Sequence, residues 1–175
     1  MTTLPIPRIE TARLVLRAPV ASDFPAFAAF RASDRARSVG GPYGEREAFQ
    51  QLCAIAGHWQ MRGYGRWMVA DRATDAPLGV VGPFMPVGWP EPEIGWSVFD
   101  GAEGRGVAFE AALAARAWVY RTLRWTTVVS MIAPDNARSI ALARRLGAAP
   151  DGDFADPDFG RFQIWRHPAP EACAA

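Results

Sequence analysis

The chain has 175 residues, of which half are apolar and about a fifth are charged, a composition typical of a globular domain. Nineteen basic and 18 acidic side chains leave a net charge of +1, which argues against a nucleic-acid partner. Every basic side chain is an arginine, so no lysine can act as a base or bind a phosphate. We therefore expect a single domain over residues 1–175, with a loose tail after about residue 168.

The chain contains two cysteines, Cys53 and Cys173, and two histidines, His58 and His167. These are too few for a disulfide framework or a typical closed zinc site, so we expect no metal. Neither histidine has an acidic or nucleophilic neighbour in the sequence, and we expect structural or surface roles for both. No stretch approaches the ~18 apolar residues of a membrane span. Residues 1–10 lack a signal-peptide pattern, so we expect a cytoplasmic protein with no membrane partner.

Proline and glycine separate short elements along the first half of the chain. The pattern predicts a strand at 13–17, a helix at 24–31, a loop at 38–44, a helix at 45–61, and a hairpin with strands at 66–71 and 78–84. Residues 83–92 hold four prolines, which predicts a loop.

The second half begins with an alternating segment, 93–99, whose apolar residues at 94, 96 and 98 predict a strand with one buried face. A turn at 100–105, a helix from 107 to about 123, a strand at 126–132, a helix from about 134 to 146 and a strand at 161–166 follow. The order β-α-α-β-β-β-α-β-α-β predicts an α/β fold with a mixed sheet.

The turn before the helix at 107 is rich in small residues, with Gly104, Gly106 and Ala108 in alternate positions. Small residues let the backbone approach a ligand, and the helix N-terminus supplies free N–H donors with a partial positive charge. This combination suits a phosphate or pyrophosphate, although a tight turn into a buried helix has the same pattern. A Walker loop is excluded because it needs lysine, and Phe109 stands where a dinucleotide fingerprint has its third glycine.

Residues 93–110 read Glu-Ile-Gly-Trp-Ser-Val-Phe-Asp-Gly-Ala-Glu-Gly-Arg-Gly-Val-Ala-Phe-Glu. They resemble the acetyl-CoA motif of the GNAT acyltransferase superfamily, and most closely its RimJ/RimL-type branch. That branch has a Glu-Ile-Gly-aromatic strand followed by Gly-Lys-Gly-aromatic-Ala-Thr-Glu-Ala. A second block resembles the family's Asn-x-x-Ser-x-x-Leu and Leu-Gly-Phe, through Asn136, Ser139, Leu142, Leu146 and Gly147. With residues 10–17, which resemble the branch's first strand, the resemblance covers about residues 10–166.

The resemblance implies a mixed, mostly antiparallel central sheet that splays after its fourth strand and is flanked by about four helices. It implies acyl transfer from acetyl-CoA to an amine, with pantetheine in the splayed gap. The positions that match the family's cofactor contacts are Val98 for pantetheine, the backbone of Gly104, Arg105, Gly106, Val107 and Ala108 for the pyrophosphate, and Asn136 beside the cofactor.

Two departures from the family bear on the chemistry. Glu103 places an acid beside the expected pyrophosphate, where Arg105 is positioned in the sequence to compensate it. Many members use a tyrosine as general acid at the position that is Ala143 here, so the resemblance makes Ser139 the candidate acid. A serine early in a helix also bonds back to the N-cap region, which is the competing interpretation.

Glu93 is the candidate general base, because it opens the strand beside the cofactor gap and a buried carboxylate has a raised pKa. The competing interpretation is an exposed glutamate in the Pro-Glu-Pro-Glu turn. Tyr43 and Trp89 lie in predicted loops and are candidates for binding the acceptor. The acceptor amine is either a protein N-terminus or a small molecule. A non-catalytic acyl-CoA-binding protein is the alternative function, and the family suggests a homodimer.

Overall fold

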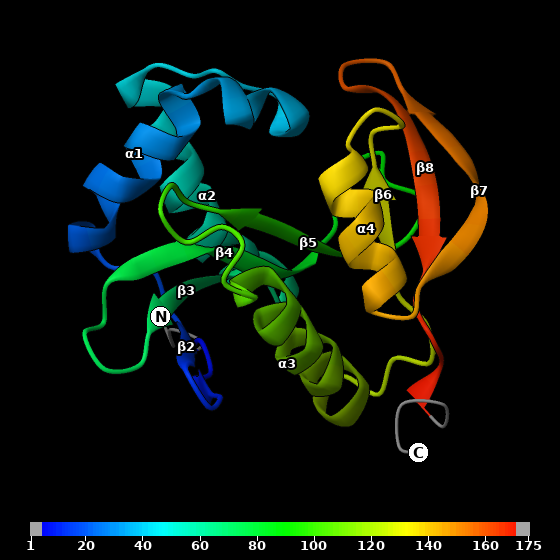
Figure 1. The fold of residues 1–175 in the computed structure, drawn as a ribbon, viewed down its shortest axis with the longest axis horizontal. Coiled ribbons are helices and arrows are strands. Elements are labelled where there is room, and N and C mark those ends of the chain that lie inside the picture. Colours follow the sequence, from blue (N-terminus) through cyan, green and yellow to red (C-terminus); the bar gives the residue numbers. More distant parts are fainter. Residues whose placement is uncertain (1–4, 171–175) are drawn as a thin grey trace.

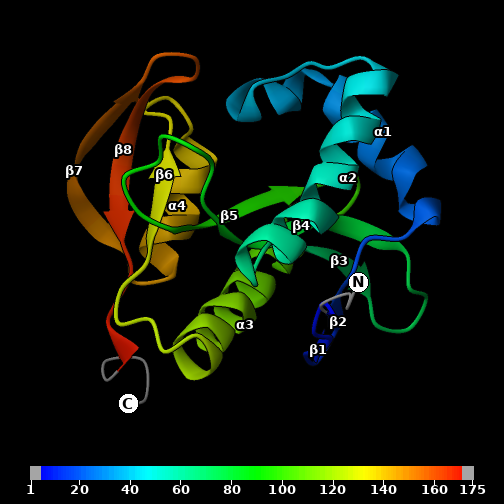
Figure 2. The same ribbon diagram turned by 180° about the vertical axis from the view of Figure 1, so that it is seen from behind.

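A computed structural model of the chain describes residues 5–170. Its eight strands form one sheet, with helices on both faces (Figures 1 and 2). The strands are β1 (Ile9–Glu10), β2 (Leu14–Arg17), β3 (Trp67–Asp71), β4 (Pro77–Phe84), β5 (Glu93–Val98), β6 (Val129–Ile132), β7 (Ala149–Asp156) and β8 (Gly160–Arg166). The α-helices are α1 (Phe24–Ala32), α2 (Glu45–Arg62), α3 (Val107–Thr122) and α4 (Ala137–Arg145), with 3-10 turns η1 (Ala21–Asp23) and η2 (Asp34–Val39).

The strand order is β1-β2-β3-β4-β5-β6-β8-β7, and within it only the β5–β6 pair is parallel. Strand β5 pairs with β4 along its whole length, from Val98 opposite Gly79 to Glu93 opposite Phe84. By contrast, β5 and β6 pair only at Glu93 and Val129. The sheet therefore splays after β5, which is the fourth of the predicted strands. The predicted mixed, mostly antiparallel sheet and its four helices are confirmed.

Two apolar layers hold the helices to the sheet. On one face, α3 packs its alanines, among them Ala111 and Ala115, against β-strand residues such as Val81 and Ile94. Alanines let the helix approach the sheet closely, so the turn that precedes α3 sits directly at the end of β5. On the other face, α1 and α2 pack against the side chains of β3 and β4 that point away from α3.

The structure adds two strands that the sequence pattern did not predict, β1 and β7. Strand β7 contains Pro150 and Gly152, which are typical of turns, and its register shifts between Pro150 and Asp153. It tolerates both because it is an edge strand whose side chains are mostly exposed. The predicted strand at 126–132 begins three residues too early, and part of the predicted loop at 38–44 belongs to η2.

Within residues 5–170, no helix combines the length and apolar character needed to cross a bilayer. His58 links α2 to the segments around it, since its Nδ1 lies 2.7 Å from the Tyr64 carbonyl and its Nε2 accepts from the Met85 N–H. Cys173 and most of the tail after residue 168 lie outside the described residues.

Candidate active site

The turn between β5 and α3 presents its backbone to solvent. Gly104 (φ +69°) and Gly106 (φ +77°) both have left-handed backbone, and Gly106 is the N-cap of α3. The Glu110 N–H donates to the Gly106 carbonyl, so the amides of the preceding first-turn residues have no partner within the helix. A Cβ at Gly104 would meet no atom within 4 Å. Free amides in left-handed turns are typical of phosphate-binding sites, so the geometry fits the predicted pyrophosphate contact.

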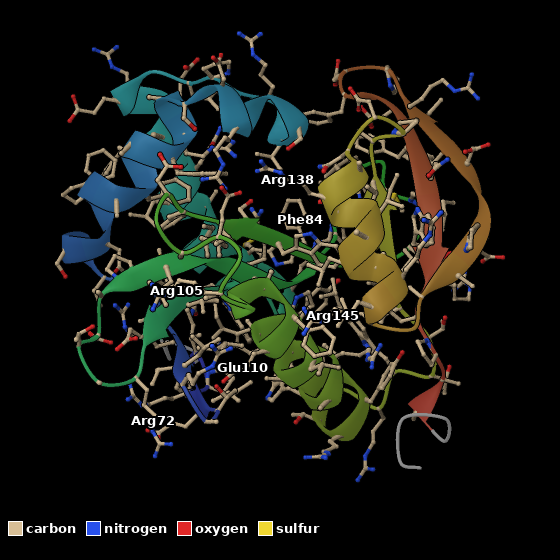
Figure 3. The ribbon with its side chains drawn as sticks, viewed as in Figure 1. Arg72, Phe84, Arg105, Glu110, Arg138 and Arg145 are labelled. Atoms are coloured by element: carbon tan, nitrogen blue, oxygen red, sulfur yellow. The ribbon has the colours of Figure 1, made fainter. Side chains whose placement is uncertain are left out.

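Arg13 supports this turn from the segment just before β2. Its guanidinium donates to the Arg105 carbonyl at 2.9 Å and forms a 2.6 Å ion pair with Glu110 in the first turn of α3. Two cavities, of about 460 and 560 Å³, lie on either side of Arg13; Gly106 and Arg145 line the first, and Arg105 and Val107 line the second. Figure 3 shows Arg105, Glu110 and Arg145 around the start of α3. Three arginines, Arg13, Arg105 and Arg145, therefore line the two cavities beside the start of α3.

The acidic Glu103 is neutralised by residues from both sides of the splay. Its Oε1 accepts from Arg35 in η2 at 2.6 Å and from Arg138 in α4 at 2.9 Å. Arg35 also donates to the Val98 carbonyl at 2.7 Å, the backbone group expected to meet pantetheine. Arg105 makes no ion pair with Glu103 and donates to the Gly101 carbonyl at 3.4 Å. The Glu103 carboxylate is therefore paired by Arg35 and Arg138, and whether Arg105 offsets its charge toward a bound pyrophosphate stays a prediction.

Asn136 and Ser139 form the start of α4, on the far side of the gap from β5. The Asn136 side chain accepts from the Ser139 N–H at 3.1 Å, which caps the helix. The Ser139 hydroxyl oxygen accepts from the Trp96 indole N–H of β5, also at 3.1 Å. The Ser139 backbone amide, and not its hydroxyl, makes the contact with the N-cap. The hydroxyl proton therefore stays available to another acceptor.

Glu93 is buried, with 8% of its surface exposed, so the interpretation as an exposed turn residue is wrong. Loss of solvent raises the pKa of its carboxyl group to about 7. The Met131 N–H donates to Glu93 Oε2 at 2.9 Å and lowers the pKa in part, as does the charge of Arg66. The Trp89 indole also lowers it, although its buried Nε1 makes no complete hydrogen bond. A carboxyl group with this pKa is half ionised at neutral pH.

Gly95 and Phe84 are neighbours of Glu93 in the sheet. A Cβ at Gly95 would lie 3.6 Å from Glu93 Oε1, in ordinary van der Waals contact with the carboxyl group. Phe84 of β4 lies opposite Glu93 of β5. The Arg66 guanidinium carbon lies over the Phe84 ring, 4.0 Å from the ring centroid. Figure 3 shows Phe84 near the centre of the molecule, between the α1–α2 side and α4.

Tyr43 and Trp89 approach this region from opposite sides. The Arg31 guanidinium lies over the Tyr43 ring at 4.5 Å, and Arg31 is close enough to Arg66 to lower the pKa of that guanidinium. A Cβ at Gly40 would contact both Tyr43 and Phe159, whose ring packs against Trp89 with centroids 6.1 Å apart. Figures 1 and 2 both show η2 beside the β7–β8 turn.

Several of the residues predicted from the sequence lie along β5 or contact it. Glu93 opens β5, Val98 closes it about 17 Å further on, and the glycine turn follows. Trp96 holds Ser139 beside the strand between these ends. Sequence reasoning missed Arg31, Arg35, Arg66 and Arg138, which come from four different elements or loops and share no motif. No sequence signal separates them from the chain's other arginines.

Comparisons with known proteins agree with this geometry. A family model for the acetyltransferase (GNAT) domain matches residues 13–149. An acetyltransferase from Agrobacterium tumefaciens is 37% identical, with a TM-score of 0.85 over 93% of this chain and 95% of that one. A putative GNAT-family acetyltransferase from Bordetella pertussis is 29% identical, with a TM-score of 0.78 over 93% of this chain and 100% of that one.

The RimL ribosomal L7/L12 alpha-N-protein acetyltransferase, in a complex with coenzyme A, is 19% identical. Its TM-score is 0.74 over 92% of this chain and 97% of that one, a likeness that shows the fold. The family model spans most of the chain, and the 37% identical structure covers nearly all of it. The chain is therefore an acyltransferase that belongs to the GNAT acetyltransferase family.

Proposed function

We propose that the protein transfers an acetyl group from acetyl-CoA to a primary amine, by direct attack of the amine on the thioester. The observation that carries this proposal is the buried Glu93, whose carboxyl pKa is about 7 and which opens the strand bordering the splay. A base for an alkylammonium ion works best when its own pKa lies near the working pH.

The residues at the other end of β5 suit the cosubstrate. Backbone amides from Gly104 to Ala108 bind the pyrophosphate, with Arg105 beside them. The Val98 backbone pairs with pantetheine once Arg35 shifts from its carbonyl, and the Asn136 amide group faces the same gap from α4. Coenzyme A supplies the acetyl group as a thioester, which is activated toward attack by an amine.

The chemistry asks for one proton acceptor and one proton donor. An alkylamine has a pKa near ~10, so only about one molecule in 10³ is neutral at pH 7. Glu93 takes a proton from the ammonium group, directly or through water, and the freed nitrogen attacks the acetyl carbon. The new C–N bond forms, the C–S bond breaks, the nitrogen loses a second proton as it becomes an amide, and the sulfur takes a proton and leaves as a thiol. Ser139 is the proposed donor to the sulfur, because its hydroxyl already accepts from Trp96, and the proton released by the nitrogen restores the hydroxyl.

The acceptor is proposed to bind between Tyr43 and Trp89, whose rings reach the Glu93 region from the loop after η2 and from the loop after β4. A protein N-terminus and a small molecule both provide a primary amine. RimL is a protein N-terminal acetyltransferase by its description, and its likeness to this chain supports the first of these acceptors only through the fold.

The first experiment separates cofactor binding from catalysis. Calorimetric titration with acetyl-CoA should give micromolar binding to the native chain, and Gly104→Glu should abolish it by blocking the turn and repelling the pyrophosphate. Thiol release should then be followed with a panel of amines at pH 6 to 9. The native rate is expected to rise with pH to a plateau above about 7, while Glu93→Gln loses at least about 100-fold in kcat at unchanged acetyl-CoA affinity.

Two results would contradict the proposal. Absence of binding at millimolar acetyl-CoA in a folded sample would remove the cofactor assignment. Binding without thiol release for any amine would leave a non-catalytic acyl-CoA-binding protein.

A further inference from the structure

Two arginines, Arg66 and Arg31, lie in the neighbourhood of Glu93. Arg66 precedes β3, and its guanidinium lies over the ring of Phe84, the β4 residue opposite Glu93. Arg31, in the last turn of α1, is close enough to Arg66 for their charges to interact, as Arg66 is to Glu93. A carboxylate and two guanidiniums are thus grouped on this part of the sheet. Within residues 5–170, neither Arg31 nor Arg66 has a carboxylate within ion-pair distance.

Other buried arginines of the same molecule show which hydrogen-bond and ion-pair partners a buried guanidinium has in this fold. Arg17 is 8% exposed and pairs with Asp23 at 2.8 Å and with Asp75 at 2.8 Å. Arg116 is 7% exposed and donates to the Leu146 carbonyl, with the His167 ring 3.1 Å away. Arg31 is 9% exposed and has no carboxylate partner: its guanidinium donates to the Val39 carbonyl at a long 3.2 Å and interacts with the Tyr43 side chain, and its buried Nε has no partner. A buried charge left so incompletely paired is costly.

Aromatic rings support both guanidiniums from the side. Arg31 lies 4.5 Å from the centre of the Tyr43 ring, and Arg66 lies 4.0 Å from that of Phe84. Stacking on a ring fixes the plane of a guanidinium and leaves the N–H groups at its edge free to bind an oxyanion. Desolvation lowers the pKa of Arg66 to about 10 and also lowers the pKa of Arg31. Both guanidiniums have therefore lost interactions with water, and a bound anion would replace them.

We propose that the acceptor is an amine that also carries a carboxylate, and that Arg31 and Arg66 bind this carboxylate while Glu93 receives the amine. This inference rests on the proposed function and names the class of acceptor for it. The order of the groups sets the orientation, because an ammonium group belongs beside Glu93 and a carboxylate beside the two cations. A neutral or cationic amine leaves the guanidiniums unpaired, and a polycationic one meets two like charges. The near-zero net charge of the chain conceals this local excess.

The test compares L-amino acids with the amides of the same amino acids, which keep the amine and lose the carboxylate. Thiol release from acetyl-CoA gives kcat/KM for each pair. The native chain should prefer the amino acids by roughly 10- to 100-fold, the range expected for hydrogen bonds to a charged group. Arg66→Met and Arg31→Met, which keep the stacked stem, should each lower this ratio at least about tenfold.

The ratio isolates carboxylate recognition from effects on the base. Removing Arg66 also raises the pKa of Glu93, but that change acts on both members of a pair and cancels. Arg46→Met is the matched control, because Arg46 is an exposed arginine on α2 and its loss changes the net charge equally. This control should leave the ratio unchanged. Thermal unfolding identifies any variant that fails to fold. If one arginine variant fails, the amino acid to amide ratios of the native chain and of the other arginine variant decide whether the inference holds.

A native preference for the amides, or a ratio that both arginine variants leave intact, would overturn the inference. If no amine gives turnover although acetyl-CoA binds, the proposed function fails by itself. Calorimetric titration of the amino acids and their amides into the protein saturated with coenzyme A then tests the carboxylate separately. Tighter binding of the amino acids, reduced by Arg66→Met, would keep the inference, and equal binding would end it.

Discussion

The Trp96 indole N–H donates to the Ser139 hydroxyl across 3.1 Å, which joins β5 to α4 at the place where the sheet splays. Strands β5 and β6 pair only at Glu93 and Val129, so this side-chain contact spans a region without backbone hydrogen bonds. A hydroxyl that accepts from an indole is fixed in position and still has its own proton to donate. The contact therefore fixes a proton donor beside β5 at the splay.

Substitution of Ser139 tests that role. Ser139→Ala should lower kcat roughly tenfold, since a thiol is a good leaving group and needs only modest help from an acid. The acetyl-CoA affinity should stay unchanged, because the cap at Asn136 uses the backbone amide of residue 139. Steady-state kinetics with a fixed amine checks both values. Ser139→Thr keeps the hydroxyl and serves as the control, and an unchanged kcat in Ser139→Ala would rule the hydroxyl out.

The raised pKa of Glu93 has a consequence for stability. Its value of about 7 in the folded state exceeds the ~4.3 of an unfolded glutamate, so the folded chain binds more protons between these pH values. The stability that this group contributes is complete below about pH 4.3 and is lost as pH rises through 7. Glu93→Gln should therefore be more stable than the native chain at pH 8, by up to roughly 4 kcal/mol.

Urea unfolding at pH 8 and pH 5 checks this prediction. The advantage of Glu93→Gln should shrink strongly at pH 5, where the native carboxyl is mostly protonated. The amide oxygen of the substituted side chain can accept from the Met131 N–H, so the variant retains that hydrogen bond. Equal stability of the two proteins at pH 8 would mean that the carboxyl group is better solvated than its burial indicates.

The glycine turn could be predicted from the sequence because its determinants are local. Gly104, Gly106 and the helix that starts at Val107 are contiguous, and a left-handed turn before a helix follows from residue type alone. The position of Glu93 followed from the same segment, but its raised pKa did not. Its carboxyl group is buried among residues distant in the sequence, such as Met131, which is 38 residues away and donates a hydrogen bond to it.

The two guanidiniums of the proposed acceptor site lay beyond sequence reasoning for the same reason. Arg31, Arg66 and Glu93 come from a helix, a loop end and a strand, and only the packing of α1 and α2 against the sheet brings them together. The spacing of these residues in the sequence does not predict that they form a cluster. Strand β7 was missed for a different cause, since an exposed edge strand tolerates the proline and glycine that predict a turn.

Glu103 offers a test of the electrostatics at the cofactor turn. Its carboxylate occupies Arg35 and Arg138 and places negative charge beside the proposed pyrophosphate site. Glu103→Gln removes that charge and frees both cations for an anion, so the acetyl-CoA Kd should fall by about three- to tenfold at low salt. The gain should diminish at ~1 M salt because exposed charges are screened.

Calorimetry at two salt concentrations measures this effect. Glu45→Gln, at an exposed acid on α2, is the control for net charge and should leave the Kd unchanged. Weaker binding in Glu103→Gln would show instead that the Arg35 and Arg138 contacts hold the turn in its binding shape.

His167, which follows β8 and contacts β6, predicts an opposite pH effect. It is 4% exposed, its Nδ1 lies 3.1 Å from Arg116 Nη1, and its Nε2 lies 3.0 Å from the Ser130 hydroxyl, which donates to the Ile94 carbonyl. Desolvation, with help from the Arg116 charge, lowers the pKa of this histidine to about 3. The folded chain therefore binds fewer protons than the unfolded chain below about pH 6.5, and stability is lost as pH falls from 6.5 toward 3.

The Glu93 effect runs the other way in part of this range, so the histidine is best measured in the Glu93→Gln background. Between pH 7 and pH 5, Glu93→Gln should lose about 2 kcal/mol more than Glu93→Gln combined with His167→Gln, in urea unfolding. Glutamine can accept from Arg116 and donate to Ser130, so the double variant should keep the links between α3, β6 and the segment after β8. Parallel pH profiles in the two proteins would mean that His167 titrates normally, and that its contact with Arg116 opens readily in solution.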